Sequence, residues 1–222
     1  MGEFISLATV DLSQERSLGP WTAGWGSGSR IALHPTPLES QPSAYVQEAW
    51  RDRLWGRTPE VLVHFVQTTR LVLVRMEWAC QSPRFRAADN DVFADACALL
   101  FPANGQTAPL ATMGSEAEPV VAWQWRAGAE TAYVADATGL GTLSRRQSHD
   151  LTVTAEWRQE RWAVVFAAHP LAENNGRAGS PGASDLVAFA VWEGANQERA
   201  GLASYSPVWS RLRKAVPAGG AR

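Results

Sequence analysis

The chain has 222 residues, 45% of them hydrophobic and 19% charged, with a formal net charge of −2. This composition is typical of one globular domain, and the charge gives no electrostatic reason to expect binding to nucleic acid or to an anionic membrane. No apolar run reaches transmembrane length, and the first residues lack the pattern of a signal peptide. We therefore expect a single domain over residues 1–222, with residues 1–30 and 215–222 loop-like or peripheral.

The N-terminal quarter of the chain predicts only marginal elements. Residues 4–12 could form a first edge strand, and residues 19–30 are rich in glycine, which is typical of a loop. The strand-like residues 31–34 run into two prolines, and proline lacks the N–H that a central strand donates. An edge strand or an extended strap is expected there, followed by one helical turn within residues 45–55.

A hairpin is predicted over residues 61–78. Its two runs, VLVHFVQ and LVLVRMEW, are rich in β-branched residues and are separated by a polar turn. In the second run every other side chain is large and apolar, while Arg75 and Glu77 lie on the opposite face, as expected for a half-buried strand. His64 lies inside the first run, where we expect a hydrogen-bonded structural histidine rather than a metal ligand.

The hydrophobic pattern between Asn90 and Leu100 indicates a short helix. Either Asn90 or Asp91 could cap its first turn. Apolar residues recur with helical spacing, at Phe93, Ala96, Cys97 and Leu100. Three acidic residues lie near the start of this helix, at Asp89, Asp91 and Asp95. Helix capping and the helix dipole explain them better than metal binding does.

The second half of the chain is predicted to be strand and turn. Residues 119–126 alternate aromatic side chains with smaller ones, and residues 131–135 form a weaker strand. Residues 151–157 and 162–168 predict a second hairpin, and the continuous apolar run at 186–192 is typical of a central strand. Together these elements favour an all-β fold, an antiparallel β-sandwich with one or two short helices.

The sequence contains no motif of a catalytic site, such as a nucleophile elbow, a zinc-protease helix, a phosphate-binding loop or a dinucleotide fingerprint. Cys80 and Cys97 lack the spacing of a zinc site or a CxxCH haem attachment. We expect two buried thiols, with a disulfide as the alternative. Covalent c-type haem is therefore excluded, whereas non-covalent haem b is not.

Met113 lies on a Met-Gly turn just before the strand at residues 119–126. A thioether is a soft ligand suited to haem iron or Cu(I), but most methionines fill gaps in cores, and spacing alone does not separate the two roles. Tryptophans in predicted loops suggest another function, because Trp21, Trp25 and Trp55 could stack on sugar rings in a carbohydrate-binding module.

Four blocks in series resemble one known family. They are DVFADA with LFP at 91–102, MG with PV and WQW at 113–125, WAVVF with PL at 162–171, and AFAVWEG followed by ER, G and SYS at 188–206. In this order they are similar to the haem b-binding gamma subunit of type II molybdenum enzymes of the dimethyl sulfoxide reductase family. Ethylbenzene dehydrogenase, dimethyl sulfide dehydrogenase, selenate reductase and chlorate reductase carry such subunits. The likeness covers most of the chain from about His34 onward.

The resemblance implies a β-sandwich that holds one haem b between a methionine and a lysine. Met113 falls on the family's methionine, and Trp123, Phe166 and Trp192 are candidates for aromatic residues beside the haem. Such a subunit is not itself an enzyme. It passes electrons between the iron–sulfur subunit of a molybdenum-cofactor enzyme and an external carrier, either a soluble cytochrome or a quinone-linked one. The resemblance implies a periplasmic, exported complex, and a cytoplasmic, membrane-associated complex is the alternative.

The sequence departs from this family at the lysine ligand. The matching position is Ala203, whose methyl group cannot bind iron. Met113 alone could hold the haem with an open or water-filled sixth position, another residue could replace the lysine, or the chain could be a haem-free docking subunit. The candidate replacement ligands are His34, His169, Tyr205 and Lys214.

Overall fold

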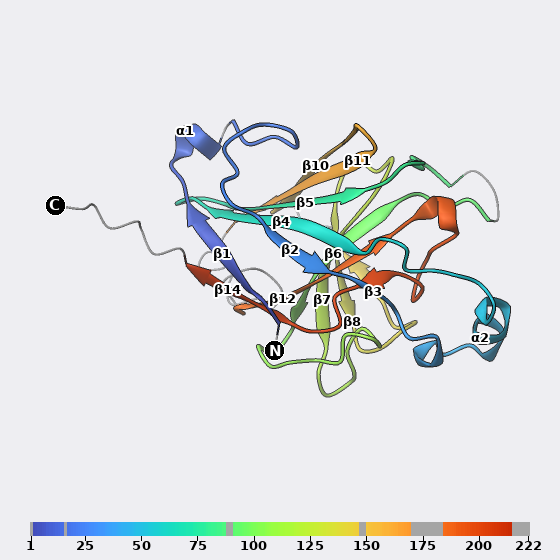
Figure 1. Cartoon of the computed structure of the whole chain (residues 1–222). Helices are drawn as coiled ribbons and strands as arrows, with labels where there is room; N and C mark the ends of the chain where they lie inside the picture. Colours follow the sequence, from blue (N-terminus) through green and yellow to red (C-terminus); the bar gives the residue numbers. More distant parts are fainter. Residues whose placement is uncertain (1, 16, 88–90, 147–149, 170–183, 215–222) are drawn as a thin grey trace.

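The chain folds into two layers of strands that cross at a steep angle (Figure 1). The computed structural model describes residues 2–15, 17–87, 91–146, 150–169 and 184–214. The first layer contains β1 (Phe4–Thr9), β2 (Ser29–Ala32), β4 (Glu60–Gln67), β5 (Val72–Ala79), β10 (Leu151–Arg158), β11 (Arg161–Ala168) and β14 (Ser210–Lys214). The second contains β3 (His34–Pro35), β6 (Ala96–Pro102), β7 (Val120–Arg126), β8 (Tyr133–Ala137), β9 (Ser144–Arg146), β12 (Leu186–Trp192) and β13 (Ser204–Tyr205).

Helices are short in the part of the chain that the structure describes. They are α1 (Leu12–Glu15), α2 (Ala44–Trp50) and single 3-10 turns at Leu38–Ser40 and Gly194–Asn196. Helix α2 begins where the Ser43 hydroxyl accepts a hydrogen bond from the backbone N–H of Val46. No described helix has both the length and the apolar character needed to cross a membrane. The predicted all-β sandwich with one or two short helices is confirmed.

Both predicted hairpins are present and lie side by side. Strand β4 pairs with β5, β10 pairs with β11, and β11 also pairs with β5, all antiparallel. Gln159 and Glu160 turn the second hairpin with φ values of 50° and 57°, which is the left-handed geometry of a tight two-residue turn. Strand β5 is covered on both faces rather than half-buried, since Arg75 is only 6% exposed.

The first strand is not at an edge. Strand β1 lies between β14 and β4 and runs parallel to both, so the fold is a mixed rather than a wholly antiparallel sandwich. Its partner β14 is almost the whole chain away, and Ile5 on β1 is buried at 1% exposure. The prediction of an edge strand was wrong because the sequence of a single short strand does not indicate how many other strands pair with it.

The predicted helix at 90–100 is also wrong over the residues that the structure describes. Residues 96–102 form β6, which pairs with β12 on one side and β7 on the other and is buried along its whole length. A strand covered on both faces is apolar at every position, so helical spacing occurs in it by chance. Contrary to the sequence prediction, Asp91 and Asp95 therefore do not cap a helix. Asp89 lies outside the described residues.

Asp95 is instead a fully buried acceptor that joins four segments. Its carboxylate accepts hydrogen bonds from the Trp162 indole N–H (2.9 Å), from the backbone N–H of Arg84 (2.8 Å) and Gly194 (2.8 Å), and from the Cys80 thiol (3.5 Å). Burial, followed by the charge of Asp95, raises the pKa of Cys80 to about 12. Cys80 and Cys97 are both free and buried, as predicted.

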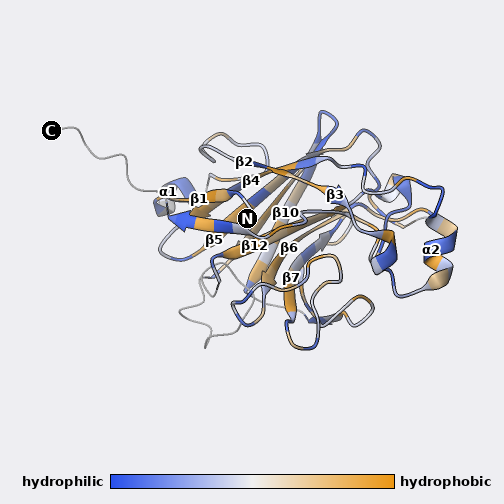
Figure 2. Ribbon diagram, turned by 60° about the horizontal axis from the view of Figure 1, so that its bottom comes forward, coloured by the Kyte–Doolittle hydropathy of each residue, from blue (hydrophilic) through white to orange (hydrophobic). Residues whose placement is uncertain are grey.

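The main core lies between the two layers (Figure 2, where hydrophobic residues concentrate in the strands). Every second side chain of β6, β7 and β12 points into this core, and the largest of them are Leu99, Phe101, Trp123, Trp125 and Phe189. Strand β12 links the layers, because Leu186 and Val187 pair with β14 whereas residues 188–192 pair with β6. The remaining side chains of these strands point to the outer face of the second layer.

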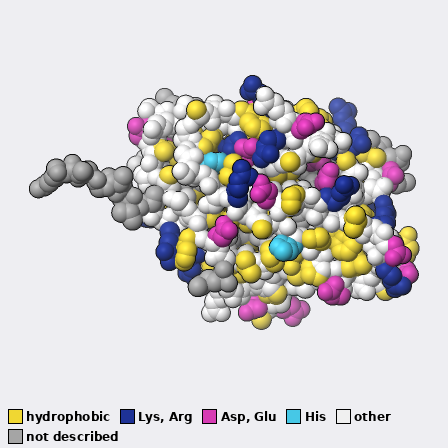
Figure 3. All heavy atoms as spheres, viewed as in Figure 1, with side chains coloured by type: hydrophobic (Ala, Val, Ile, Leu, Met, Phe, Trp, Pro, Cys, Tyr) yellow, Lys and Arg dark blue, Asp and Glu magenta, His cyan; other side chains and the backbone are white. Residues whose placement is uncertain are grey.

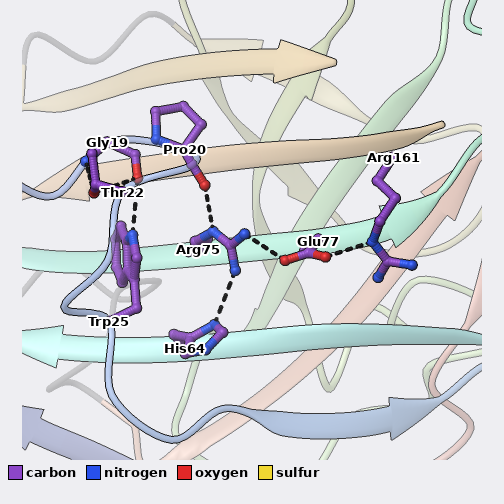
Figure 4. A network of polar contacts seen from close by, with 8 residues as sticks. All are labelled: Gly19, Pro20, Thr22, Trp25, His64, Arg75, Glu77 and Arg161. Carbon is purple, nitrogen blue, oxygen red and sulfur yellow. Dashed lines mark hydrogen bonds and ion pairs between the residues drawn. The ribbon is translucent and has the colours of Figure 1, made fainter. Parts of the chain in front are cut away.

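A buried ionic network fastens the glycine-rich loop to the outer face of the first layer (Figure 4). Arg75 donates from Nε to the carbonyl oxygen of Pro20 (2.7 Å), pairs with Glu77, and lies 3.5 Å from Nδ1 of His64. Glu77 also pairs with Arg161 on β11. The predicted structural role of His64 is thus consistent with its 7% exposure and its contact with Arg75.

This network predicts that the protein loses stability in acid. Burial, and then the charge of Arg75, lower the pKa of His64, so below about pH 6.5 the unfolded chain gains a proton that the folded chain does not. Burial alone would raise the pKa of Glu77, but Arg161 and Arg75 outweigh it and lower that pKa, which adds a further loss below about pH 4.5. The free energy of unfolding should fall by up to about 1.4 kcal/mol per pH unit for each proton taken up.

Urea unfolding of the His64→Gln variant between pH 7 and 5 checks this prediction. The variant should lose the upper part of the pH dependence, whereas a His34→Gln control, at an exposed position on β3, should keep it. An unchanged slope in His64→Gln would contradict the assignment.

Candidate functional site

A groove of about 600 Å³ lies on the outer face of the second layer. Its floor comes from β6, β7 and β8, and the side chains there are small: Ala98, Ala122 and Ala137. Because side chains alternate along a strand, the aromatic core and this alanine floor are opposite faces of one sheet. The volume is within the range of about 300–1,000 Å³ for small-molecule sites, and methyl groups let a flat ligand approach the sheet closely.

Met113 lies at the groove on a tight turn. Its backbone is left-handed (φ 59°), and the N–H groups of Met113 and Gly114 donate to the carbonyl oxygens of Leu110 (3.1 Å) and Pro109 (2.8 Å). A Cβ at Gly114 (φ 86°) would lie 2.8 Å from the carbonyl oxygen of Glu118, so only glycine fits there. A non-glycine residue in this conformation costs on the order of 1–3 kcal/mol, and the two hydrogen bonds of the turn help to hold Met113 in it.

Trp192 forms a wall of the same groove. It ends β12, is 7% exposed, and its indole N–H donates to the carbonyl oxygen of Ala200 (3.0 Å). The segment beyond it is fixed by Gln41, whose amide donates to the carbonyl oxygen of Gly201 (2.9 Å) and packs so closely that a Cβ at Gly201 would clash. The ring and this segment are therefore held rigidly beside the alanine floor.

The structure brings together some of the predicted site residues and separates others. Met113 and Trp192 both line the groove, and Ala203 is buried in the apolar cluster beneath it without being part of the lining. Trp123 and Phe166 lie on the far side of the sheet, in the core between the layers, with their rings 6.5 Å apart. Trp123 alternates with Ala122 and Gln124 along β7, so the aromatic residue and the groove-lining residues necessarily face opposite ways.

None of the four candidate replacement ligands lines the groove. His34 is exposed on β3 opposite Tyr205, which is buried on β13, while His169 and Lys214 are exposed at the ends of β11 and β14. Among the described residues that line the groove, Met113 alone has a thioether, imidazole, thiol or amine side chain. No group of three or more His, Cys, Asp or Glu residues in the described ranges could hold a metal ion.

One end of the groove is polar, and the sequence did not predict this. Gln124 and Arg145 line it, and a smaller pocket of about 140 Å³ shares both residues and continues to Arg126 and Arg199. One sequence signal could have indicated the groove itself. The alternation of larger and smaller residues in WQW and LVAFAVW marks a strand face without the bulkiest side chains. Of the loop tryptophans, Trp25 is 5% exposed and hydrogen-bonded to Gly19, whereas Trp21 and Trp55 are half-buried, and the Trp55 indole N–H donates to the carbonyl oxygen of Thr36.

Comparison with known proteins finds relatives among subunits of oxidoreductases. The chain is 32% identical over 162 residues to the chlorate reductase subunit gamma of Ideonella dechloratans, covering 70% of this chain and 65% of the relative. The chain is related to this gamma subunit. It is 28% identical over 197 residues to the "Putative respiratory nitrate reductase heme subunit ORF7" of Haloferax mediterranei, covering 88% and 68%, respectively. It is 28% identical over 171 residues to the dimethylsulfide dehydrogenase subunit gamma of Rhodovulum sulfidophilum, covering 72% and 64%.

This relationship confirms the resemblance to gamma subunits. The chain spans 64–68% of the length of these three relatives, and no family model matches it. Solved structures with a similar outline include a "putative carbohydrate-binding protein" of Bacteroides uniformis (12% identity, TM-score 0.49, covering 96% of this chain and 100% of that one). Another is a family 9 carbohydrate-binding module of Caldicellulosiruptor kristjanssonii with cellotriose (8% identity, TM-score 0.44, covering 99% and 98%). Both TM-scores are below 0.5, so neither likeness bears on function.

Proposed function

We propose that this chain is a non-catalytic electron-transfer subunit of an oxidoreductase complex and that it binds haem b in the alanine-floored groove. The observation that carries the proposal is the position of Met113, which lines a groove of suitable volume in a relative of gamma and haem subunits. When bound, haem would supply a one-electron Fe(III)/Fe(II) couple. The chain's own part is to bind it, orient it and exclude water.

Each group in the groove has a role in this proposal. The Met113 thioether would hold the iron, and a neutral sulfur ligand favours Fe(II), which would raise the reduction potential. Ala98 and Ala122 leave room for a flat ring against the sheet, and Trp192 closes one side of it. The largely apolar walls disfavour the extra charge of oxidised iron, which raises the potential further.

The groove offers one protein ligand among its described residues, with Ala203 in place of the family's lysine. A single thioether is a weak ligand of ferric iron, so we expect the oxidised cofactor to be high-spin and readily lost. The ferrous form should be held more firmly, because sulfur is a soft donor.

The proposed partners are a molybdenum-cofactor catalytic subunit, an iron–sulfur subunit and an external carrier, either a soluble cytochrome or a quinone-linked one. Exposed apolar side chains support a place in a complex: Tyr45 and Leu54 are 81% and 80% exposed around α2. Hydrophobic side chains gather between β3 and α2 on the face seen in Figure 3. We place the complex in the periplasm, with a cytoplasmic, membrane-associated complex as the alternative.

A spectrum tests the proposal. The purified chain, titrated with haemin under reducing conditions, should develop a Soret band with one equivalent bound and give a b-type pyridine haemochrome. Absence of a saturable Soret band, with the fold intact by circular dichroism, would overturn haem binding.

The second candidate is a haem-free subunit that docks and stabilises the same partners, and Ala203 is the observation that favours it. It predicts that the complex, isolated with its partners, contains iron equal to that of the clusters alone. Iron in excess of the clusters would count against it.

A further inference from the structure

Three arginines converge on one end of the groove without carboxylate partners. Arg126 on β7, Arg145 on β9 and Arg199 after β12 line the smaller pocket that continues the groove, and within the described residues none of them forms an ion pair. The chain as a whole has a net charge of −2, so this excess of positive charge is local. Unpaired cations at the rim of a pocket indicate that its ligand carries negative charge at that end.

The nearby acidic group does not neutralise them. Glu198 lines the same pocket but is 1% exposed, and its oxygens accept from the backbone N–H of Gly56 (2.7 Å) and Glu193 (2.9 Å) and from the Asn196 amide (2.9 Å). Its carboxylate is therefore occupied by the loop that it fastens. The arginine N–H groups remain available to a ligand.

Two of the guanidinium groups are held in place. The Arg145 guanidinium lies over the ring of Tyr133, 4.6 Å from its centroid, and that of Arg199 lies over the ring of Phe93 at 4.5 Å. Stacking uses the face of a guanidinium and leaves its N–H edge free for a planar, two-oxygen acceptor such as a carboxylate. The groove thus has a thioether at one site and, at its end, oriented arginine N–H donors that a carboxylate can accept from.

We propose that this arginine end is a carboxylate-binding site that receives the propionate groups of the haem and so fixes its orientation in the groove. The inference rests on the proposed function, since it names the residues that recognise the ligand's acidic groups. It assigns the rim next to Gln124 and Arg145 to the propionates, and the alanine floor near Met113 to the apolar part of the macrocycle. Arg126 and Arg145 are binding residues that touch the ligand's acidic groups, not its metal.

Titration of the full chain under reducing conditions with haemin and with haemin dimethyl ester, whose propionates are uncharged, tests this site. The Arg126→Gln/Arg145→Gln variant should bind haemin about tenfold more weakly, as expected for two solvent-accessible charged pairs, yet bind the ester within about twofold of the unmodified chain. Raising the salt concentration should weaken haemin binding to the unmodified chain and leave ester binding unchanged.

Arg146→Gln is the matched control. Arg146 is the next residue on β9, does not line the groove and pairs with Asp136 (3.0 Å), so its loss should leave both affinities unchanged. If the double variant binds haemin as tightly as the unmodified chain, or loses haemin and ester affinity equally, the carboxylate site is overturned while haem binding stands. If the unmodified chain binds neither compound, the proposed function itself fails.

Discussion

Replacing Met113 with alanine is expected to remove the Soret band of the haem-loaded chain or to shift it, and to weaken haem binding by about tenfold or more. No other thioether, imidazole, thiol or amine lines the groove among its described residues, so the iron would have no protein ligand left. Absorbance titration with haem under reducing conditions measures the change. The comparison requires equal concentrations of folded protein, established by circular dichroism.

Two matched variants separate ligation from packing. Met113→Leu keeps the side-chain volume and bears the same left-handed backbone, so it should cost less than about 1.5 kcal/mol of stability while losing the sulfur. Met76→Leu makes the same exchange on β5, inside the core and away from the groove, and should leave the spectrum unchanged. A normal spectrum in Met113→Leu would remove Met113 from the site and show that the chain binds haem without its sulfur.

The largest effect on stability is expected from Asp95→Ala. Asp95 is 0% exposed, and its carboxylate accepts from Trp162, Arg84, Gly194 and Cys80. Truncation leaves buried N–H groups on three different segments without acceptors. Losses of this kind cost about 3–5 kcal/mol, a large part of the total stability of a domain. Chemical unfolding in urea, with the slope of the transition compared between variants, measures the loss.

Asp91→Ala is the control for this experiment, because Asp91 belongs to the same segment but is exposed. It should change the free energy of unfolding by no more than about 0.5 kcal/mol. Asp95→Asn keeps the shape but replaces one acceptor oxygen with a donor, so an intermediate loss is expected. Equal stability of Asp95→Ala and Asp91→Ala would show that the hydrogen bonds to Asp95 contribute little.

Local sequence signals were sufficient where an element is formed by neighbours in the chain. The hairpins β4–β5 and β10–β11 were predicted because both strands and the turn between them lie within one short stretch. The Met113-Gly114 turn was likewise predictable, since glycine after the turn residue has a local backbone reason. At β6 the signal was misleading, because a run that is apolar at every position fits a helix and a doubly covered strand equally well.

The composition of the site depended on which face of each strand the fold covers. Alternation in WQW places Trp123 and Gln124 on opposite faces, but it does not say which face meets the other layer. The fold turns Trp123 to the core and Gln124 to the groove. Of the aromatic residues expected beside a ligand, Trp192 lines the groove, whereas Trp123 and Phe166 face the core. Alanines and arginines form much of the remaining lining of the groove and of the smaller pocket beside it.

By itself the sequence determined the all-β class, the two hairpins, the buried thiols and the Met-Gly turn, because each is encoded by residues close together in the chain. Only the tertiary structure decided that β1 joins β14, that Asp95 ties four segments together, and that Arg126, Arg145 and Arg199 meet at one end of a groove. These are contacts between distant residues, and they follow from how the layers pack rather than from any local pattern.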